Sequence, residues 1–114
     1  MSHRVTKKRK PIATLPPPVN VLLGPYITTD VDPHNLKLEL YLNGQVRQSC
    51  NTGEMLFKIP QIIAFLSRAM TLLPGDIICT GTCAGTGALA PGDEVEVRLE
   101  KVGSLRNRCR REDR

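Results

Sequence analysis

The feature that most constrains the fold is an Asn-Gly pair between two strand-like runs. Before it, leucines alternate with polar or aromatic residues at four positions: Leu36, Leu38, Leu40 and Leu42. Alternation with a period of two is typical of a strand with one buried face. Asn43 and Gly44 follow at once, and they tolerate the positive φ angles that a two-residue type I′ turn requires. The sequence therefore predicts a β-hairpin whose second strand covers residues 45–50.

A helix is predicted after the hairpin. Residues 51–53 form a polar break, and Pro60 then opens a helical stretch at a position where its missing N–H costs nothing. Four apolar residues fall on one face at helical spacing: Ile62, Ile63, Leu66 and Met70. This face is expected to pack against a sheet.

Two Pro-Gly-Asp turns, at residues 74–76 and 91–93, each precede an apolar run. The first is expected to lead into a short strand over residues 76–80. The second leads into an alternating strand with Val95, Val97 and Leu99 on one face. Gly103 is expected to mark a further turn, after which a basic tail begins.

Together these elements predict a single β-rich α+β domain of at least four strands and one helix, which suits a chain of 114 residues. Pairing is expected to be largely antiparallel, because the gap between the last two predicted strands is too short for a helical crossover. Residues 1–22, with a run of bases and then a run of prolines, are expected to be an irregular lead-in. The domain is placed at residues 23–107, and residues 108–114 form the basic tail.

The net charge of +5 is concentrated at the two ends of the chain. Residues 11–105 carry six Lys and Arg and nine Asp and Glu, a net charge of −3. Basic termini of this kind are usually solvated, although clustered bases can also bind the phosphates of nucleic acid. No aromatic residue stands in either tail to stack on bases, and no apolar segment is long enough to cross a membrane. We therefore expect neither a nucleic-acid nor a membrane partner.

The cysteines signal zinc only weakly. The chain has four of them: Cys50, Cys79, Cys83 and Cys109. They form no Cys-x-x-Cys pair, and both histidines, His3 and His34, are distant in sequence. No apolar segment follows the basic N-terminus, so a secretory signal is not expected. Reduced cysteines and a cytoplasmic location are the resulting expectation.

A glycine-rich loop over residues 79–87 is the segment that could carry chemistry. Its sequence is Cys-Thr-Gly-Thr-Cys-Ala-Gly-Thr-Gly. Small residues let the backbone approach a ligand, and threonine hydroxyls and backbone N–H groups can hold a carboxylate or an oxyanion. The loop fits no phosphate-binding pattern, because it lacks Gly-Lys-Thr and no helix-forming run follows it. Composition alone leaves open the alternative of a flexible strand connector.

Several motifs follow one another in a characteristic order along residues 36–107. They are the hairpin with its Asn-Thr ending, Met-x-Phe at 55–57, Leu-x-Pro-Gly-Asp at 72–76, Thr-Gly-Thr at 80–82 and the second Pro-Gly-Asp at 91–93. In this order they resemble the C-terminal region of the fumarylacetoacetate hydrolase family, over about three-quarters of the chain. The family includes acylpyruvate hydrolases and the hydratases and isomerases of aromatic-compound breakdown.

The resemblance implies part of a mixed β-sandwich roll, usually dimeric, with Mg²⁺ or Mn²⁺ held by three carboxylates. The metal would chelate a 2-oxo or 1,3-diketo acid and stabilise the enolate left when a C–C bond breaks. By its place in the motif, Thr82 corresponds to the family threonine that hydrogen-bonds the substrate carboxylate. Gly81 would give close backbone approach, and Thr80 is a weaker candidate for substrate binding.

The chain departs from the family pattern in its metal ligands. It shows no counterpart of the family's Glu-x-Glu pair, of its later Asp or of the lysine beside the metal site. Asp30 and Asp32 precede the match in a different local context and are not taken as ligands. Cys83 stands where proline is usual, which is expected to loosen the loop. The resemblance thus assigns no catalytic residue and no metal ligand to this chain.

Two functional hypotheses follow. In the first, the chain is a truncated family member whose reaction is metal-dependent C–C hydrolysis, isomerisation or hydration of acylpyruvate or diketo acids. It would be inactive alone, because it lacks ligands to hold the metal. In the second, it is a non-catalytic interaction or dimerisation module that pairs with itself or with a full-length paralogue. A piece of a larger β-domain would also expose strand edges, so partial folding or aggregation is expected.

Overall fold

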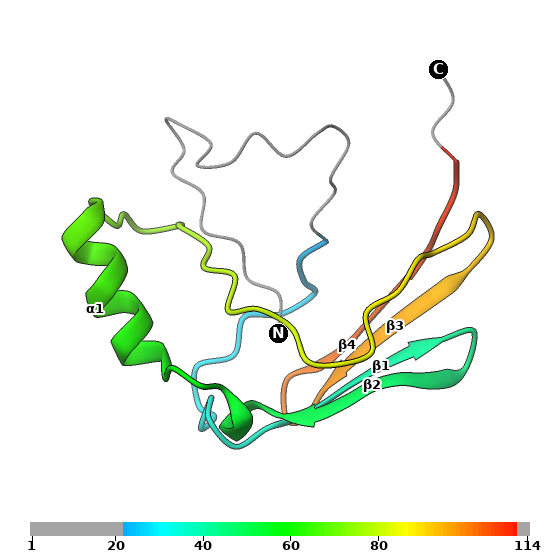
Figure 1. Ribbon diagram of the computed structural model, residues 1–114, viewed down its shortest axis with the longest axis horizontal. Helices are drawn as coiled ribbons and strands as arrows, with labels where there is room; N and C mark the ends of the chain where they lie inside the picture. Colours follow the sequence, from blue (N-terminus) through cyan, green and yellow to red (C-terminus); the bar gives the residue numbers. More distant parts are fainter. Residues whose placement is uncertain (1–21, 112–114) are drawn as a thin grey trace. The chain divides into compact units, whose positions relative to one another are not determined.

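The computed structural model describes residues 22–111. In chain order the elements are β1 (Lys37–Leu42), β2 (Gln45–Asn51), a short 3₁₀ helix η1 (Thr52–Glu54), α1 (Ile59–Ala69), β3 (Glu94–Leu99) and β4 (Gly103–Arg108). The strands form one antiparallel sheet in the order β2-β1-β3-β4 (Figure 1). The predicted β-rich α+β class with at least four strands and one helix is confirmed.

The chain divides into two compact units. Of the described residues, 24–54 and 83–111 form a sheet unit, and 22–23 and 55–82 form an α1 unit. Residues 1–21 of the predicted lead-in and residues 112–114 of the predicted tail lie outside the described residues. The sheet unit contains all four strands.

The predicted hairpin is confirmed in its strands and in its turn. Asn43 and Gly44 have φ angles of 51° and 80°, both positive as a type I′ turn requires. Asn43 also ties the turn to the start of β3: its Nδ2 donates to Asp93 Oδ1 at 2.9 Å, and its Oδ1 accepts the N–H of Glu94 at 2.9 Å. The hairpin turn therefore helps to position the strand that pairs on the other side of β1.

The second strand of the hairpin contains one residue more than the stretch of β1 opposite it. Leu40 pairs with Gln48 and Tyr41 pairs with Val46, so Arg47 has no partner in the register. An extra residue of this kind is a β-bulge, which bends the strand and redirects the groups beside it. The bulge places Arg47 beside the glycine-rich loop.

One face of the sheet is apolar. Paired residues of β1 and β3 align there: Leu38 with Leu99, Leu40 with Val97 and Leu42 with Val95. Leu38 is 8% exposed, and Leu36, directly before β1, is 2% exposed. Leu36 is fixed by Thr52, whose Oγ1 accepts its N–H at 2.9 Å and whose own N–H donates to its carbonyl at 2.8 Å. The predicted alternation is confirmed, since the apolar residues of both strands share one face, but only Leu36 and Leu38 are buried on it and the others are half-buried.

The structure corrects the prediction for the C-terminal region. A turn and then a solvated basic tail were predicted from residue 103, but residues 103–108 form β4, which pairs with β3. Arg106 lies 2.9 Å from Glu96 and 3.5 Å from Glu94, and Arg108 lies 3.7 Å from Glu94. Leu105, which opposes Val97, is the one apolar side chain in β4. A single apolar residue gives no alternation that could be recognised in the sequence. These arginines offset the acids of the neighbouring strand, although solvent screens exposed ion pairs of this kind.

The predicted helix is confirmed at α1, with Pro60 in its first turn. The side chain of Gln61 accepts the N–H of Lys58, the residue before the helix, at 2.9 Å. This contact satisfies one of the donors that a helix start leaves unpaired. Among the described residues, no helix is long and apolar enough to cross a membrane.

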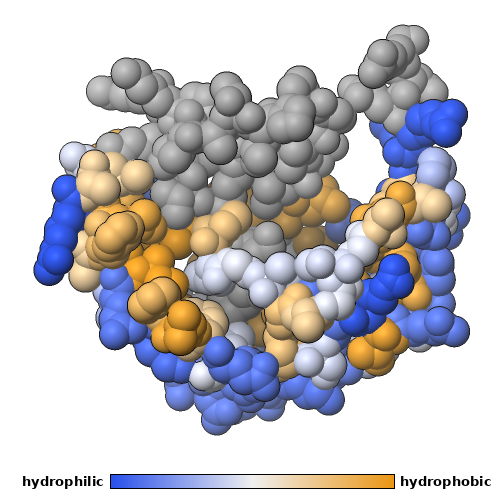
Figure 2. All heavy atoms as spheres, viewed as in Figure 1, coloured by the Kyte–Doolittle hydropathy of each residue, from blue (hydrophilic) through white to orange (hydrophobic). Residues whose placement is uncertain are grey.

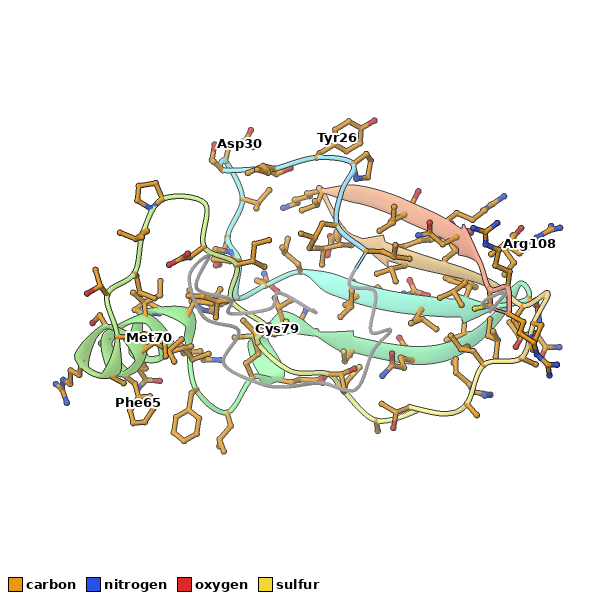
Figure 3. The ribbon with its side chains drawn as sticks, turned by 90° about the horizontal axis from the view of Figure 1, so that it is seen from above. Tyr26, Asp30, Phe65, Met70, Cys79 and Arg108 are labelled. Atoms are coloured by element: carbon orange, nitrogen blue, oxygen red, sulfur yellow. The ribbon has the colours of Figure 1, made fainter. Side chains whose placement is uncertain are left out.

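The apolar face predicted for α1 is only partly covered. No residue of α1 is buried, and Ile63, predicted on the packed face, is 42% exposed. Phe65 is 71% exposed, as are Leu56 at 86% and Phe57 at 61% just before the helix. Figure 2 shows hydrophobic side chains gathered over α1, and Figure 3 shows Phe65 pointing away from the helix axis. Met70, the last member of the predicted face, lies one residue beyond the helix.

The strand predicted over residues 76–80 is not formed, and this segment has irregular backbone. A continuous apolar run becomes a buried strand only where neighbouring strands accept and donate its backbone hydrogen bonds. The sheet of the described residues consists of the four strands named above and gives this segment no place. The count of four strands was therefore correct although one member was wrong, with β4 replacing residues 76–80.

Candidate functional site

The glycine-rich loop of residues 79–87 passes from one compact unit into the other. Its residues up to Thr82 belong to the α1 unit, and those from Cys83 onward belong to the sheet unit. Gly81 adopts a φ of 96°, a conformation that glycine reaches easily and other residues rarely adopt. Of the predicted substrate-binding residues, Gly81 and Thr82 are exposed and Thr80 is half-buried.

Strand β2 holds the loop at Cys83. The side-chain amide of Gln48 donates from Nε2 to the carbonyl oxygen of Cys83 at 2.7 Å. Gln48 pairs with Leu40, so its side chain lies on the apolar side of the sheet, where an unpaired amide would be costly. The hydrogen bond satisfies the amide and fixes the residue that directly follows Thr82 in the chain.

Two loop glycines approach β2 so closely that a side chain would not fit easily. A Cβ on Gly85 would overlap the carbonyl oxygen of Arg47, and the φ of Gly85 is 106°. A Cβ on Gly87 would lie 3.0 Å from Nη2 of the Arg47 guanidinium. Arg47 is the extra residue of the β-bulge, so the bulge presents both its carbonyl and its guanidinium to the loop.

A second contact between β2 and Cys83 involves Cys50. Both residues are half-buried free thiols. Burial, together with a hydrogen bond to the Cys83 thiol, raises the pKa of the Cys50 thiol to about 11. The Cys50 side chain therefore remains protonated at neutral pH. Strand β2 thus contacts Cys83 at its carbonyl and, through Cys50, at its side chain. The loosening expected where cysteine replaces proline stays a prediction.

The part of β2 that supports the loop was missed from the sequence. It consists of three residues: Arg47, Gln48 and Cys50. One signal was available, because Gln48 occupies a position that faces the apolar side of the hairpin, where an amide needs a hydrogen-bonding partner. The role of Arg47 had no such signal, since it depends on a bulge that only the strand register reveals.

The described residues do not fit the Mg²⁺ or Mn²⁺ site that the resemblance implies. They contain no group of three or more His, Cys, Asp and Glu side chains that could hold a metal ion. Asp32, close to the matching region, instead accepts the N–H of His34 at 3.0 Å. No chemical step through a metal can therefore be derived from the groups described in this chain.

The loop can offer hydrogen-bond donors to an anion. Threonine hydroxyls and backbone N–H groups suit a carboxylate, and Gly81 lets the backbone come close to it. The Arg47 guanidinium lies beside Gly87, in the part of the loop that belongs to the sheet unit.

The sequence matches the family model described as fumarylacetoacetate (FAA) hydrolase C-terminal over residues 19–110. It is 52% identical over 77 residues to a 4-hydroxyphenylacetate degradation bifunctional isomerase/decarboxylase from Escherichia coli. The aligned region covers 68% of this chain and 18% of that protein. The family match extends slightly beyond both ends of the domain predicted at residues 23–107.

Two solved structures show the same likeness in three dimensions. One is a 5-carboxymethyl-2-hydroxymuconate delta-isomerase from Mycobacterium smegmatis, with a TM-score of 0.77, 43% identity and coverage of 80% of this chain and 36% of that one. The other is a maleylpyruvate hydrolase from Sphingobium sp. SYK-6 in complex with manganese(II) ion and pyruvate. It has a TM-score of 0.72 and 41% identity, and the match covers 75% of this chain and 33% of that one. The chain thus spans 36% or less of each of these three proteins.

Proposed function

The chain belongs to the fumarylacetoacetate hydrolase family, and from this premise we propose that its loop at residues 80–82 binds the carboxylate of a small keto acid. The reaction class is C–C hydrolysis, isomerisation or hydration of acylpyruvate or diketo acids. The observation that carries the proposal is Gly81, which has a φ of 96° between two threonines. Cys83, held by β2, follows directly after this trio of residues.

Each loop residue has a distinct part in this proposal. The hydroxyl of Thr82 donates a hydrogen bond to the carboxylate, and the absence of a side chain at Gly81 lets the ligand reach the backbone. Thr80, which is half-buried, is the weaker candidate for contact with the same ligand. The pyruvate in the related maleylpyruvate hydrolase structure is itself a 2-oxo acid, which agrees with this ligand class.

We further propose that this chain has no activity by itself and is truncated relative to the catalytic unit. A related structure contains manganese, and a divalent metal would supply Lewis-acid stabilisation of an enolate when bound. The described residues offer no cluster of ligands for such an ion. The chain's own contribution is to bind and orient the carboxylate, while residues of a longer family polypeptide hold the metal.

A pyruvate titration followed by amide NMR tests the binding role. We expect the signals of Gly81 and Thr82 to shift as pyruvate is added to the purified chain. Thr82→Val removes the hydroxyl donor at nearly constant volume and should weaken binding about tenfold, or about 1.4 kcal/mol. Thr82→Ser should retain binding, and Thr86→Val, in the same loop, is the matched control that should leave it unchanged.

Two results would contradict the proposal in separate ways. Equal pyruvate affinity in the parent chain and Thr82→Val would remove the carboxylate role from this loop. Metal-dependent turnover of an acylpyruvate by the purified chain would instead leave the binding role intact and disprove the absence of activity.

A non-catalytic association module is the second candidate, because large apolar side chains are exposed in and before α1. Leu56, Phe57 and Phe65 are all more than half exposed. Such side chains mark interaction surfaces when they lie together. A chain that binds no pyruvate but elutes as a dimer in gel filtration would favour this candidate, with either a second copy or a longer paralogue as partner. We propose a cytoplasmic location under both candidates, because the cysteines of the described residues form no disulfide.

A further inference from the structure

Cys50 and Cys83 lie together where the loop meets β2, and the keto-acid proposal gives this thiol pair no role. We propose that they form a modification site that a small-molecule disulfide, such as oxidised glutathione, converts into an intramolecular disulfide. The bond would tie the loop covalently to β2 just after Thr82.

The position of Cys83 is fixed by contacts with β2 at Cys83 itself and two residues after it. Its carbonyl accepts the Gln48 amide at 2.7 Å, and two residues later Gly85 lies against the backbone of Arg47. Gln48 and Cys50 are two residues apart on β2, so their side chains lie on the same side of the strand. The amide that holds the Cys83 backbone therefore stands next to the Cys50 thiol, on the same side of β2.

The other cysteines are less suited to this partnership. Cys79 is exposed and belongs to the α1 unit. Cys109 follows β4, where its N–H donates to the carbonyl of Asp93 at 2.7 Å. Because β4 and β2 are the two opposite edges of the sheet, Cys109 is separated from Cys50 by β1 and β3. Among the cysteines of the sheet unit, Cys50 and Cys83 are thus the pair that lies on the same side of β2.

The exchange proceeds in two balanced steps. The deprotonated sulfur of Cys83 attacks one sulfur of oxidised glutathione, forms a mixed disulfide and releases one glutathione thiol. Cys50 then loses its proton and attacks the Cys83 sulfur, and the second glutathione leaves and takes up a proton. Overall, two protein thiols are oxidised and one glutathione disulfide is reduced to two thiols. Burial and a raised pKa keep the Cys50 thiol protonated at neutral pH, which suits it to the second, resolving step.

The consequence for ligand binding rests on the proposed function. A covalent link at Cys83 restricts the backbone next to Thr82, so it would alter carboxylate binding if the loop has that role. The disulfide itself does not depend on any ligand. Its formation can therefore be tested without pyruvate, which keeps the two proposals separable.

The test is peptide mapping by mass spectrometry after the full chain is incubated with oxidised glutathione. Remaining thiols are alkylated before digestion, and we expect a linked peptide pair that contains Cys50 and Cys83. Cys50→Ser should stop at a mixed disulfide on Cys83, since it removes only the resolving thiol. Cys109→Ser is the matched control and should form the same linked pair as the parent.

The proposal fails if the link joins Cys79 to Cys83, or if glutathione stays on Cys50 and Cys83 without a bond between them. Hydrogen exchange provides a second measurement on the same samples. Oxidation should slow amide exchange over residues 83–87, and dithiothreitol should restore the original rate. Unchanged exchange in the oxidised chain would overturn the claim that the disulfide tethers the loop.

Discussion

The two Pro-Gly-Asp turns have the same local geometry but different surroundings. In each, the aspartate N–H donates to the carbonyl three residues earlier, and the carboxylate accepts the N–H of that same residue. The partners are Leu73 for Asp76 and Ala90 for Asp93, with all four distances between 2.7 and 3.1 Å. The middle glycines have φ angles of 88° and 92°. Proline before a glycine with positive φ is the signature of a type II turn.

The turns differ in what holds the second carboxylate oxygen. Asp93 accepts the Asn43 amide at 2.9 Å, and β3 begins at the next residue. Asp76 has a buried Oδ1 without a hydrogen-bond partner in the described part of the chain, and irregular backbone follows it. The same three residues thus make the same turn, but a strand follows only where the turn is tied to an existing hairpin.

The largest expected effect comes from cutting that tie. Asn43→Gly keeps the positive φ of the hairpin turn but removes the side-chain hydrogen bonds to Asp93 and Glu94. We expect the free energy of unfolding, measured in urea, to fall by about 1–2 kcal/mol. Amide exchange at Glu94 and Val95 should become faster as the start of β3 frays. Unchanged stability and exchange would mean that the second turn starts β3 without help from the hairpin.

Acid should weaken the same tie progressively. The Ala90 N–H and then the Asn43 amide lower the pKa of Asp93 below its usual range. The pKa of such a carboxyl is lower in the folded chain than in the unfolded chain, where it is about 3.9. Its contribution to stability is complete above the unfolded-state pKa and is lost as the pH falls through the folded-state pKa. The free energy of unfolding, measured in urea between about pH 2 and 6, should therefore fall less with decreasing pH in Asp93→Asn than in the parent chain. An identical pH dependence in both chains would contradict the role of Asp93.

The smallest effect is expected at the other turn. Asp76→Asn keeps an oxygen to accept the Leu73 N–H and replaces an unpaired oxygen with an amide. The free energy of unfolding should change by less than about 0.5 kcal/mol in the same urea measurement. A loss as large as that of Asn43→Gly would show that Asp76 has a partner outside the described residues, and the contrast between the turns would then disappear.

The elements that could be predicted are those whose signals are local. The hairpin was predictable because Asn43 and Gly44 specify their turn chemically, and the helix because Pro60 and the apolar spacing act within one segment. Residues 76–80 were predicted wrongly, because a strand requires a neighbour and the sequence names none. Strand β4 was missed because its arginines were interpreted as a solvated tail. In the structure Arg106 pairs with Glu94 and Glu96 of the neighbouring strand.

For the candidate site, the sequence revealed the loop but not its support. Gly81 and the adjacent threonines stood out through composition and motif order, and their binding role remains a prediction. The contacts of Gln48 and Cys50 with Cys83 join residues more than thirty positions apart. Contacts of this range depend on strand register and loop path, which no local pattern encodes.

The bulge at Arg47 has a consequence for how this segment can vary in length. Residues after the bulge face the side that they do because one extra residue precedes them, and side-chain direction in a strand alternates with every position. Deleting or inserting one residue between the turn and Gln48 would either move the turn or turn the amide and thiol to the opposite side. The hairpin can therefore accept substitutions along β2 far more readily than a change of even a single residue in its length.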